Sequence, residues 1–368
     1  MSTISPSPSP ARVRRGFSLT ELMIVLLIIA LIISILVPTI GGARNAARAT
    51  GTRSLLTNLS TSMSKFQGDN RRLPGYFSWD TMGHADNIDR GMTGWENVML
   101  DLMGEGAVRT DNPGGAEWLE VGPRSGETVW VNASMIGASE GGYFRPNRSN
   151  LAEQDTEVQR TNGAAPHAQD PNDPTPNTSL PDLVDDFGVP VLVWVANTVK
   201  DARNPASDAT GIARQDSSAN ALFYWATNAS LLRSDGGRYR QAENSLLGTT
   251  ASAAPQSVIN TMTALFGSPS FPGSQSNSAN PLGGNAADVY PTRARGTYVL
   301  QSAGKDRIYL SREDDNGRAN MTTEGGNRQL AYRTNFFLPD GARLQGDDGN
   351  DEQDVIEAFD DIVVAGGA

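Results

Sequence analysis

The apolar run at residues 17–37 constrains the architecture of this chain more than any other feature. As a helix rising about 1.5 Å per residue it spans about 32 Å, enough to cross a hydrocarbon core of about 30 Å. Arg12, Arg14 and Arg15 precede it without an acidic residue, as the positive-inside rule predicts for a cytoplasmic flank. An ordinary signal peptide has a shorter apolar stretch. The sequence therefore predicts a retained single-pass membrane helix.

One ionisable residue, Glu21, lies inside this run near its start. A carboxylate in lipid is unfavourable and normally has a partner or access to water. Two explanations account equally well for a charged residue here. Glu21 lies at the membrane interface, within reach of water, or it pairs with a partner group.

The residues around Glu21 favour a partner. The segment GFSLTEL at residues 16–22, with Arg14 and Arg15 before it, resembles the prepilin-peptidase site of type IV pilins and type II secretion pseudopilins. The resemblance implies cleavage after Gly16 by prepilin peptidase, N-methylation of Phe17, and retention of the helix as the core of a filament. Pro38 falls where many members of that family carry a helix-kinking proline.

The same resemblance implies the environment and the partners of the chain. It predicts insertion into the bacterial inner membrane with the N-terminus in the cytoplasm and the C-terminal domain in the periplasm, followed by transfer to a pseudopilus or pilus. The expected partners are copies of the chain, other pseudopilins or pilins, prepilin peptidase, the membrane and an inner-membrane assembly platform.

Cleavage would give Glu21 a partner. The cut creates a positive α-amino group at Phe17, and in a staggered helical bundle Glu21 of one subunit can approach Phe17 of its neighbour. Removing one member of such a pair is strongly unfavourable, so the contact can set the axial register of the subunits. We therefore expect Glu21 to act in assembly.

The sequence predicts an α+β, pilin-like fold in which the long N-terminal transmembrane helix packs on an antiparallel β-sheet with long irregular loop insertions. The expected parts are a leader at residues 1–16, the membrane helix at 17–37, its continuation at 38–67 and a globular domain at 68–368. Apolar residues at three- and four-residue spacings place one face of the continuation on the sheet: Leu55 or Leu56, Leu59, Met63 and Phe66. The stretch containing Gly41, Gly42 and Gly51 is a weak helix former and could be partly extended.

Within the globular domain, 38 Gly and 21 Pro predict a loop-rich surface, and residues 150–181 in particular read as a polar, proline-interrupted insertion. The topology of residues 68–150 cannot be derived, apart from a possible strand at 128–131. The expected strands are 189–196 (near a sheet edge, because of Pro190), 297–301, 307–311, 332–338 and 362–365. Short helices are expected at 219–232 and 257–266.

Composition excludes several classes of function. The net charge of -11 argues against a general nucleic-acid binder, although it does not exclude a local DNA-contacting patch. The chain has no cysteine, which excludes thiolate metal sites, and only two histidines, which argues against a histidine zinc site. No nucleophile elbow, phosphate-binding loop or metal-ligand cluster supports an enzyme. Catalysis by carboxylates alone is possible in principle, but scattered Asp and Glu are usually surface charge.

A second resemblance lies far from the leader. The segments DDFGVP at 185–190, YVLQSAGKD at 298–306 and FDDIV at 359–363 resemble the C-terminal region of major pseudopilins, although Arg307 stands where the family has glycine. In that family the region forms a calcium-stabilised loop, which implies Asp306, Asp360 and Asp361 as possible ligands. Calcium prefers such carboxylate oxygens. The competing interpretation is a solvated acidic loop that binds nothing specifically.

Three functions are consistent with these observations. The first is a major-like or large minor subunit of a type II secretion pseudopilus, supported by both resemblances. The second is a type IV pilus subunit for adhesion, motility or DNA uptake. The third, which no motif supports, is a membrane-tethered enzyme.

Overall fold

The computed structural model describes residues 18–88, 91–138, 142–152, 180–198, 211–233, 240–248, 256–274, 289–314, 322–324, 327–337 and 354–367. The chain divides into two compact units, residues 1–47 and 48–368. The helix α1, Leu19–Asn70, supplies most of the described part of the first unit and the opening segment of the second.

Helix α1 is continuous over its 52 residues, so the expectation of an extended stretch around Gly41, Gly42 and Gly51 is wrong. The glycines are outweighed by neighbours with high helix propensity. These are Ala43, Arg44, Ala46, Ala47, Arg48 and Ala49. The helix also continues through Pro38, and it ends where Arg71 takes a left-handed conformation with φ 56°.

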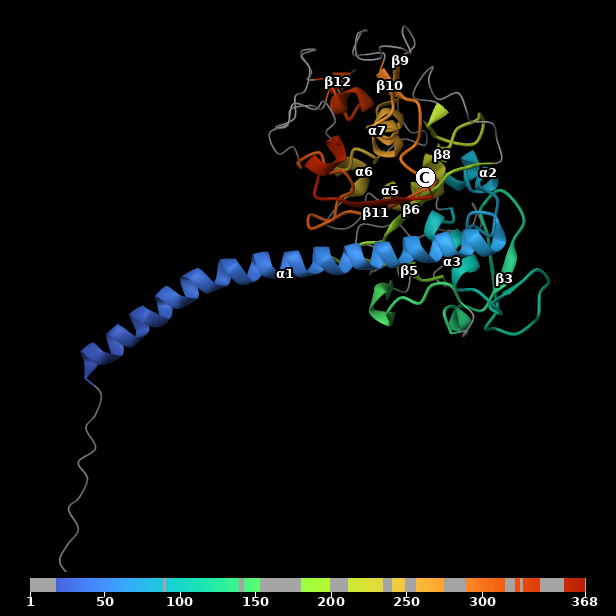
Figure 1. Cartoon of the computed structure of the whole chain (residues 1–368). Helices are drawn as coiled ribbons and strands as arrows, with labels where there is room; N and C mark the ends of the chain where they lie inside the picture. Colours follow the sequence, from blue (N-terminus) through green and yellow to red (C-terminus); the bar gives the residue numbers. More distant parts are fainter. Residues whose placement is uncertain are drawn as a thin grey trace, which may run out of the picture. The chain divides into compact units, whose positions relative to one another are not determined.

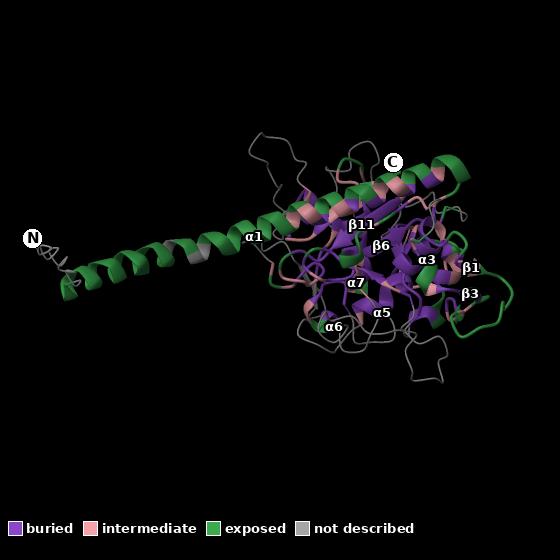
Figure 2. Ribbon diagram, turned by 90° about the horizontal axis from the view of Figure 1, so that it is seen from below, coloured by how far each residue is buried: buried purple, intermediate pink, exposed green. Residues whose placement is uncertain are grey.

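The second half of α1 packs its predicted apolar face into the core. Leu56, Leu59 and Met63 are fully buried and Phe66 is 4 % exposed, which confirms the predicted stripe. Figure 2 shows this part of the helix lying along β11 and β6 with its outer face exposed. The hydroxyl of Tyr298 joins the two elements, lying 3.0 Å from Ser60 Oγ and 2.9 Å from Ser64 Oγ.

The central sheet has three antiparallel strands in the order β14-β11-β6. Their bounds are Leu192–Val195 for β6, Tyr298–Ser302 for β11 and Ile362–Gly366 for β14. Tyr298 pairs with Val195 on one side and with Gly366 on the other. These strands confirm the predictions for 189–196, 297–301 and 362–365, including the edge position of the first.

Both faces of this sheet are buried, each in a different hydrophobic core. Val193 and Val195 face the core that contains α1 and α3 (Gly94–Leu102), whereas Leu192 and Trp194 face the core that contains α7 (Gln256–Phe266). Figure 1 shows α1 and α7 on opposite sides of the sheet. The face that carries Leu192 and Trp194 is covered by chain segments between β6 and β11. Besides α7, these include η6 (Trp225–Asn228) and α5 (Ala229–Leu232).

Short elements surround this framework. Strands β1 (Val108–Arg109), β3 (Val129–Val131) and β2 (Leu119–Val121) form a second sheet. The described residues also form four two-stranded pairs, which are β4 (Leu151–Ala152) with β5 (Asp182–Leu183), β7 (Ala213–Arg214) with β8 (Phe223–Tyr224), β9 (Pro272–Ser274) with β10 (Val289–Pro291), and β12 (Thr322–Glu324) with β13 (Asn327–Gln329). The remaining helical turns are α2 (Trp79–Met82), η1 (Ala85–Ile88), η2 (Ala133–Met135), η3 (Arg148–Asn150), α6 (Gln241–Asn244), η9 (Tyr332–Asn335) and η10 (Val355–Ala358).

Two predicted strands are wrong. Residues 307–311 form turns, because Arg307 and Leu310 adopt left-handed conformations with φ 68° and 43° that a strand does not accommodate. Residues 332–335 form the 3₁₀ helix η9, in which the Thr334 hydroxyl bonds to Ala331 O at 2.6 Å. In the predicted helical region 219–232, β8 precedes η6 and α5. Most of the predicted insertion at 150–181 lies outside the described residues.

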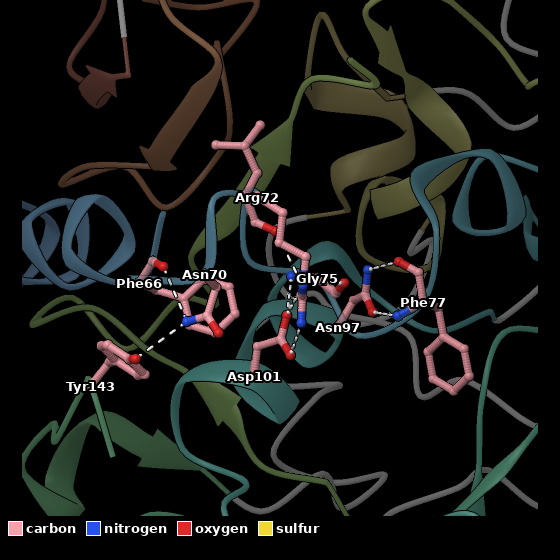
Figure 3. A network of polar contacts seen from close by, with 9 residues as sticks. Phe66, Asn70, Arg72, Gly75, Phe77, Asn97, Asp101 and Tyr143 are labelled. Carbon is pink, nitrogen blue, oxygen red and sulfur yellow. Dashed lines mark hydrogen bonds and ion pairs between the residues drawn. The ribbon is translucent and has the colours of Figure 1, made fainter. Parts of the chain in front are cut away.

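A polar network fastens the end of α1 to α3 (Figure 3). The Arg72 guanidinium pairs with both carboxylate oxygens of Asp101, at 2.6 and 2.8 Å, and Gly75 N donates to the same carboxylate at 2.7 Å. Asn97 bonds to both backbone groups of Phe77, at 2.7 and 3.0 Å. The network therefore holds the chain that leaves α1 against the next helix.

Candidate functional site

The first candidate site is the start of α1. Gly16 and Phe17, the predicted cleavage and methylation positions, lie outside the described residues. The first turn of the helix is closed by two reciprocal hydrogen bonds: Ser18 N donates to Glu21 Oε2 at 2.9 Å, and Glu21 N donates to Ser18 Oγ at 3.2 Å. This is a capping box, in which each side chain satisfies a free amide of the other residue.

The capping box gives Glu21 a local role that sequence reasoning missed. The pattern Ser-x-x-Glu ahead of an apolar run is its signal. The Glu21 side chain is exposed, and only Oε2 is engaged by Ser18. Capping therefore leaves carboxylate oxygen available to a partner outside the chain.

The first half of α1 carries a continuous series of exposed apolar side chains among the residues that the structure describes. Its large apolar side chains from Leu19 to Ile40 that the structure describes are at least 46 % exposed. The helix is long and apolar enough to cross a membrane by length and composition. Such a surface requires lipid or other helices around it.

The second candidate site joins the segments at 185–190 and 298–306. Residues 185–188 form a turn, in which Gly188 N bonds to Asp185 O at 2.9 Å and Gly188 adopts φ 80°. The Asp185 carboxylate accepts hydrogen bonds from Phe187 N at 2.9 Å and Val189 N at 3.0 Å. Its other oxygen accepts from the Ser302 hydroxyl. Two segments far apart in sequence thus share one buried carboxylate.

The electrostatics of Asp185 follow from this enclosure. Burial raises its pKa to about 6, and the hydrogen bonds from Ser302, Val189 and Phe187 oppose the rise. The neighbouring Tyr309 hydroxyl donates to Pro190 O, and burial raises the pKa of Tyr309 well above its ordinary value.

The turn at 185–188 also contacts α1. Asp186 N lies 3.2 Å from Thr52 Oγ1, and a Cβ added to Gly51 would come within 1.8 Å of Asp186 Oδ2. Gly51 therefore permits the turn to approach the helix. This packing explains a glycine that sequence reasoning took as a sign of weak helix.

The third candidate site is a cluster of carboxylates from Asp306, Asp314 and Asp360. One oxygen from each lies within 4.8 Å of the others. The structure brings together two of the three predicted ligands, Asp306 and Asp360. It adds Asp314, which the acidic run at 313–315 could have suggested.

Asp361, the third predicted ligand, has different partners. Its carboxylate accepts from Gln301 Nε2 at 2.8 Å and from Leu310 N at 2.9 Å. Burial raises its pKa well above the ordinary value. Asp361 is therefore placed to hold the turn at 307–311 against β11.

The donor set of the cluster fits a hard cation. Asp360 Oδ1 is buried and has no hydrogen-bond partner among the described residues, whereas Oδ2 accepts from Lys305 N and Asp306 N, both at 3.1 Å. Burial and mutual repulsion raise the pKa of Asp306 and Asp360. Calcium takes six to eight oxygen ligands, of which these three carboxylates could supply a part, the rest coming from carbonyls or water.

Arg307 occupies the position at which the resembled family has glycine, and it adopts the left-handed conformation that favours glycine. Its carbonyl accepts from Gln241 Nε2 at 2.7 Å. The backbone path of the loop is therefore compatible with arginine here.

Comparison with known proteins finds a described motif in the N-terminal segment of the chain. Residues 11–37 match the family model described as the prokaryotic N-terminal methylation motif. Neither the curated proteins nor the solved structures gave a match. The motif supports a type IV pilin-like or pseudopilin subunit, which is a structural class rather than an enzymatic one. It implies assembly with other pilins and processing by prepilin peptidase.

Proposed function

We propose that this chain is a structural subunit, major-like or large minor, of a type II secretion pseudopilus that drives protein export. It would be cleaved after Gly16, methylated on Phe17, anchored in the bacterial inner membrane and assembled with the C-terminal domain in the periplasm. The N-terminal methylation motif at residues 11–37 supports the class.

The observation that favours secretion over a pilus is the contact between the two C-terminal segments. Asp185 of the DDFGVP segment and Ser302 of the YVLQSAGKD segment form a buried hydrogen bond. Both segments resemble major pseudopilins, and their contact in the fold supports the proposal that they belong to one pseudopilin-like unit. A type IV pilus subunit is the alternative, because the N-terminal motif is common to both machines.

Calcium would bind at Asp306, Asp314 and Asp360 in this proposal. The ion would stabilise the loop by neutralising carboxylates that otherwise repel one another. Asp361 would support the site through Gln301 and Leu310 without entering the group of three.

Deletion of the gene in the native host tests the choice of machine. The expected result is accumulation of exported proteins in the periplasm with unchanged twitching and DNA uptake, restored by the wild-type chain. Normal secretion with lost motility or DNA uptake would instead identify a pilus subunit. Mass spectrometry of the mature chain, expected to begin at methylated Phe17, tests the processing separately.

A further inference from the structure

The two edges of the central sheet differ in how their outward backbone groups are covered. On the outer edge of β6, Asn228 Nδ2 donates to Val193 O at 3.0 Å. Gly94 of α3 is so close that an added Cβ would lie 2.1 Å from the same oxygen. The side of β6 away from β11 is thus closed by the chain itself, as edges of natural sheets usually are.

Among the described residues, the outer edge of β14 has no such cover. Gly366 O accepts from Thr297 N at 2.9 Å, so the polar backbone groups of Gly366 face the β11 side. In an extended strand the direction of these groups alternates from residue to residue, which directs those of Val363 and Ala365 outward. No described residue outside the sheet is hydrogen-bonded to either of them. The strand contains neither a charged residue nor a proline, the usual means of blocking an edge.

A groove of about 590 Å³ lies beside this edge. Val363 and Val364 line it, together with Arg53 and Thr57 from the exposed side of α1. Arg295 also lines the groove and pairs with Asp354, yet its buried Nε has no hydrogen-bond partner among the described residues. The groove therefore lies between the outward backbone groups of β14 and the exposed side of α1.

We propose that the outer edge of β14 accepts an extended segment from a second copy of this chain, which adds a strand to the central sheet. The backbone of Val363 and Ala365 specifies an extended partner, because only a strand matches the alternation of donors and acceptors. A second copy is the occupant because Arg53 and Thr57, on the exposed side of α1, line the same groove. Copies that meet along α1 are brought to this edge, so the inference rests on the proposed assembly function.

Because the chain has no cysteine, a single introduced thiol is a unique probe. Two full-length variants, Ala365→Cys and Ser54→Cys, carry a photoreactive benzophenone maleimide in membranes of producing cells. Residue 365 reports on the strand edge, and residue 54 lies on the exposed side of α1. We expect both to give a product of two copies, and the Ala365 product to contain a peptide from an extended segment of the second copy.

The outcomes separate the two proposals. Cross-linking from position 54 without any from position 365 would overturn strand addition and leave assembly intact. A product between position 365 and a different protein would overturn the second copy as occupant. Absence of both products would contradict assembly through α1, and strand addition would fall with it.

A second pair of variants separates strand pairing from proximity. Both variants carry the photoreactive probe on Arg53→Cys and differ at position 365. Ala365→Pro removes the outward N–H of that residue, whereas Ala365→Ser retains it. We expect the proline variant to lower the cross-linked yield about fivefold relative to serine, as the loss of one hydrogen bond of about 1 kcal/mol requires. Equal yields from chains of equal protease resistance would overturn strand addition. If the proline variant does not fold, the probe at position 365 decides alone.

Discussion

The carboxylate of Asp185 accepts a hydrogen bond from the hydroxyl of Ser302, 117 residues later in the chain. Asp185 closes the turn before β6, and Ser302 ends β11, so the bond joins the two strands where they leave the sheet. The turn at 185–188 also packs against α1, at Gly51 and Thr52. One buried side chain thereby fixes the positions of helix, turn and sheet.

Asp185→Asn should change the pH dependence of stability. The pKa of about 6 in the folded protein exceeds the ordinary 3.8, so between these values the folded state holds a proton that the unfolded chain has released. The contribution of this group to the free energy of unfolding therefore falls as pH rises through that window, by about 3 kcal/mol at roughly 1.4 kcal/mol per pH unit.

Asparagine does not titrate, and the Ser302 hydroxyl can accept from its amide where it donated to the carboxylate. Urea unfolding of the detergent-solubilised chain at pH 4 and pH 7, followed by tryptophan fluorescence, measures the difference between wild type and variant. The same pH slope in both proteins would show that Asp185 is not the group responsible.

Glu21→Gln should separate the two roles of Glu21. Glutamine can keep the capping hydrogen bond from Ser18 N but cannot pair with the positive amino group of a neighbour. We expect filament yield to fall by about tenfold or more, which corresponds to about 1.4 kcal/mol per contact. Electron microscopy of sheared filaments and fractionation of membranes measure assembly and insertion.

Ser18→Ala is the matched control for Glu21. It removes the hydroxyl that caps Glu21 N, at about 1 kcal/mol of helix stability, and retains the charge. Filaments should form from this variant. If Ser18→Ala lost assembly and Glu21→Gln retained it, helix capping rather than charge pairing would be the role of Glu21.

Asp314→Asn should abolish any stabilisation by calcium. A ligand at about one hundred times its Kd stabilises the folded state by about 2.7 kcal/mol, so wild-type protein should gain resistance to proteolysis in calcium and lose it in chelator. Asp111→Asn, a change in an exposed loop outside the cluster, should respond as wild type does. Equal resistance of wild type in calcium and chelator would indicate a solvated acidic loop without a specific site.

Gly304→Ala should destabilise the chain more than Gly188→Ala. Both glycines have positive φ, 67° and 80°, which disfavours alanine by about 1–2 kcal/mol. An added Cβ at Gly304 would also lie 2.2 Å from Asp360 O, whereas nothing lies within 4 Å of one at Gly188. We expect a total of about 2–4 kcal/mol for Gly304→Ala in urea unfolding, and equal losses would refute the close approach of the two loops.

Several parts of the fold could be predicted because their signals are local. The stripe of Leu56, Leu59, Met63 and Phe66 follows the helical period, and the three strands of the central sheet are short runs rich in apolar residues. The 3₁₀ helix at 332–335 escaped prediction because the segment 332–338 is rich in aromatic residues, which are also typical of strands. Tyr332 and Phe336 instead pack with Val289 in a small core of their own.

The N-terminal segment is readable without the fold: a charged flank, a motif around Gly16 and Glu21, and an apolar run long enough to span a membrane. These depend on composition and spacing along one helix. Three relations arise only on folding. Asp314 joins Asp306 and Asp360, Asp361 bonds to Gln301, and the β6 edge is closed while no described residue outside the sheet bonds to the outward groups of β14. Such relations depend on which distant segments meet, and no local pattern encodes the loop closures that bring them together.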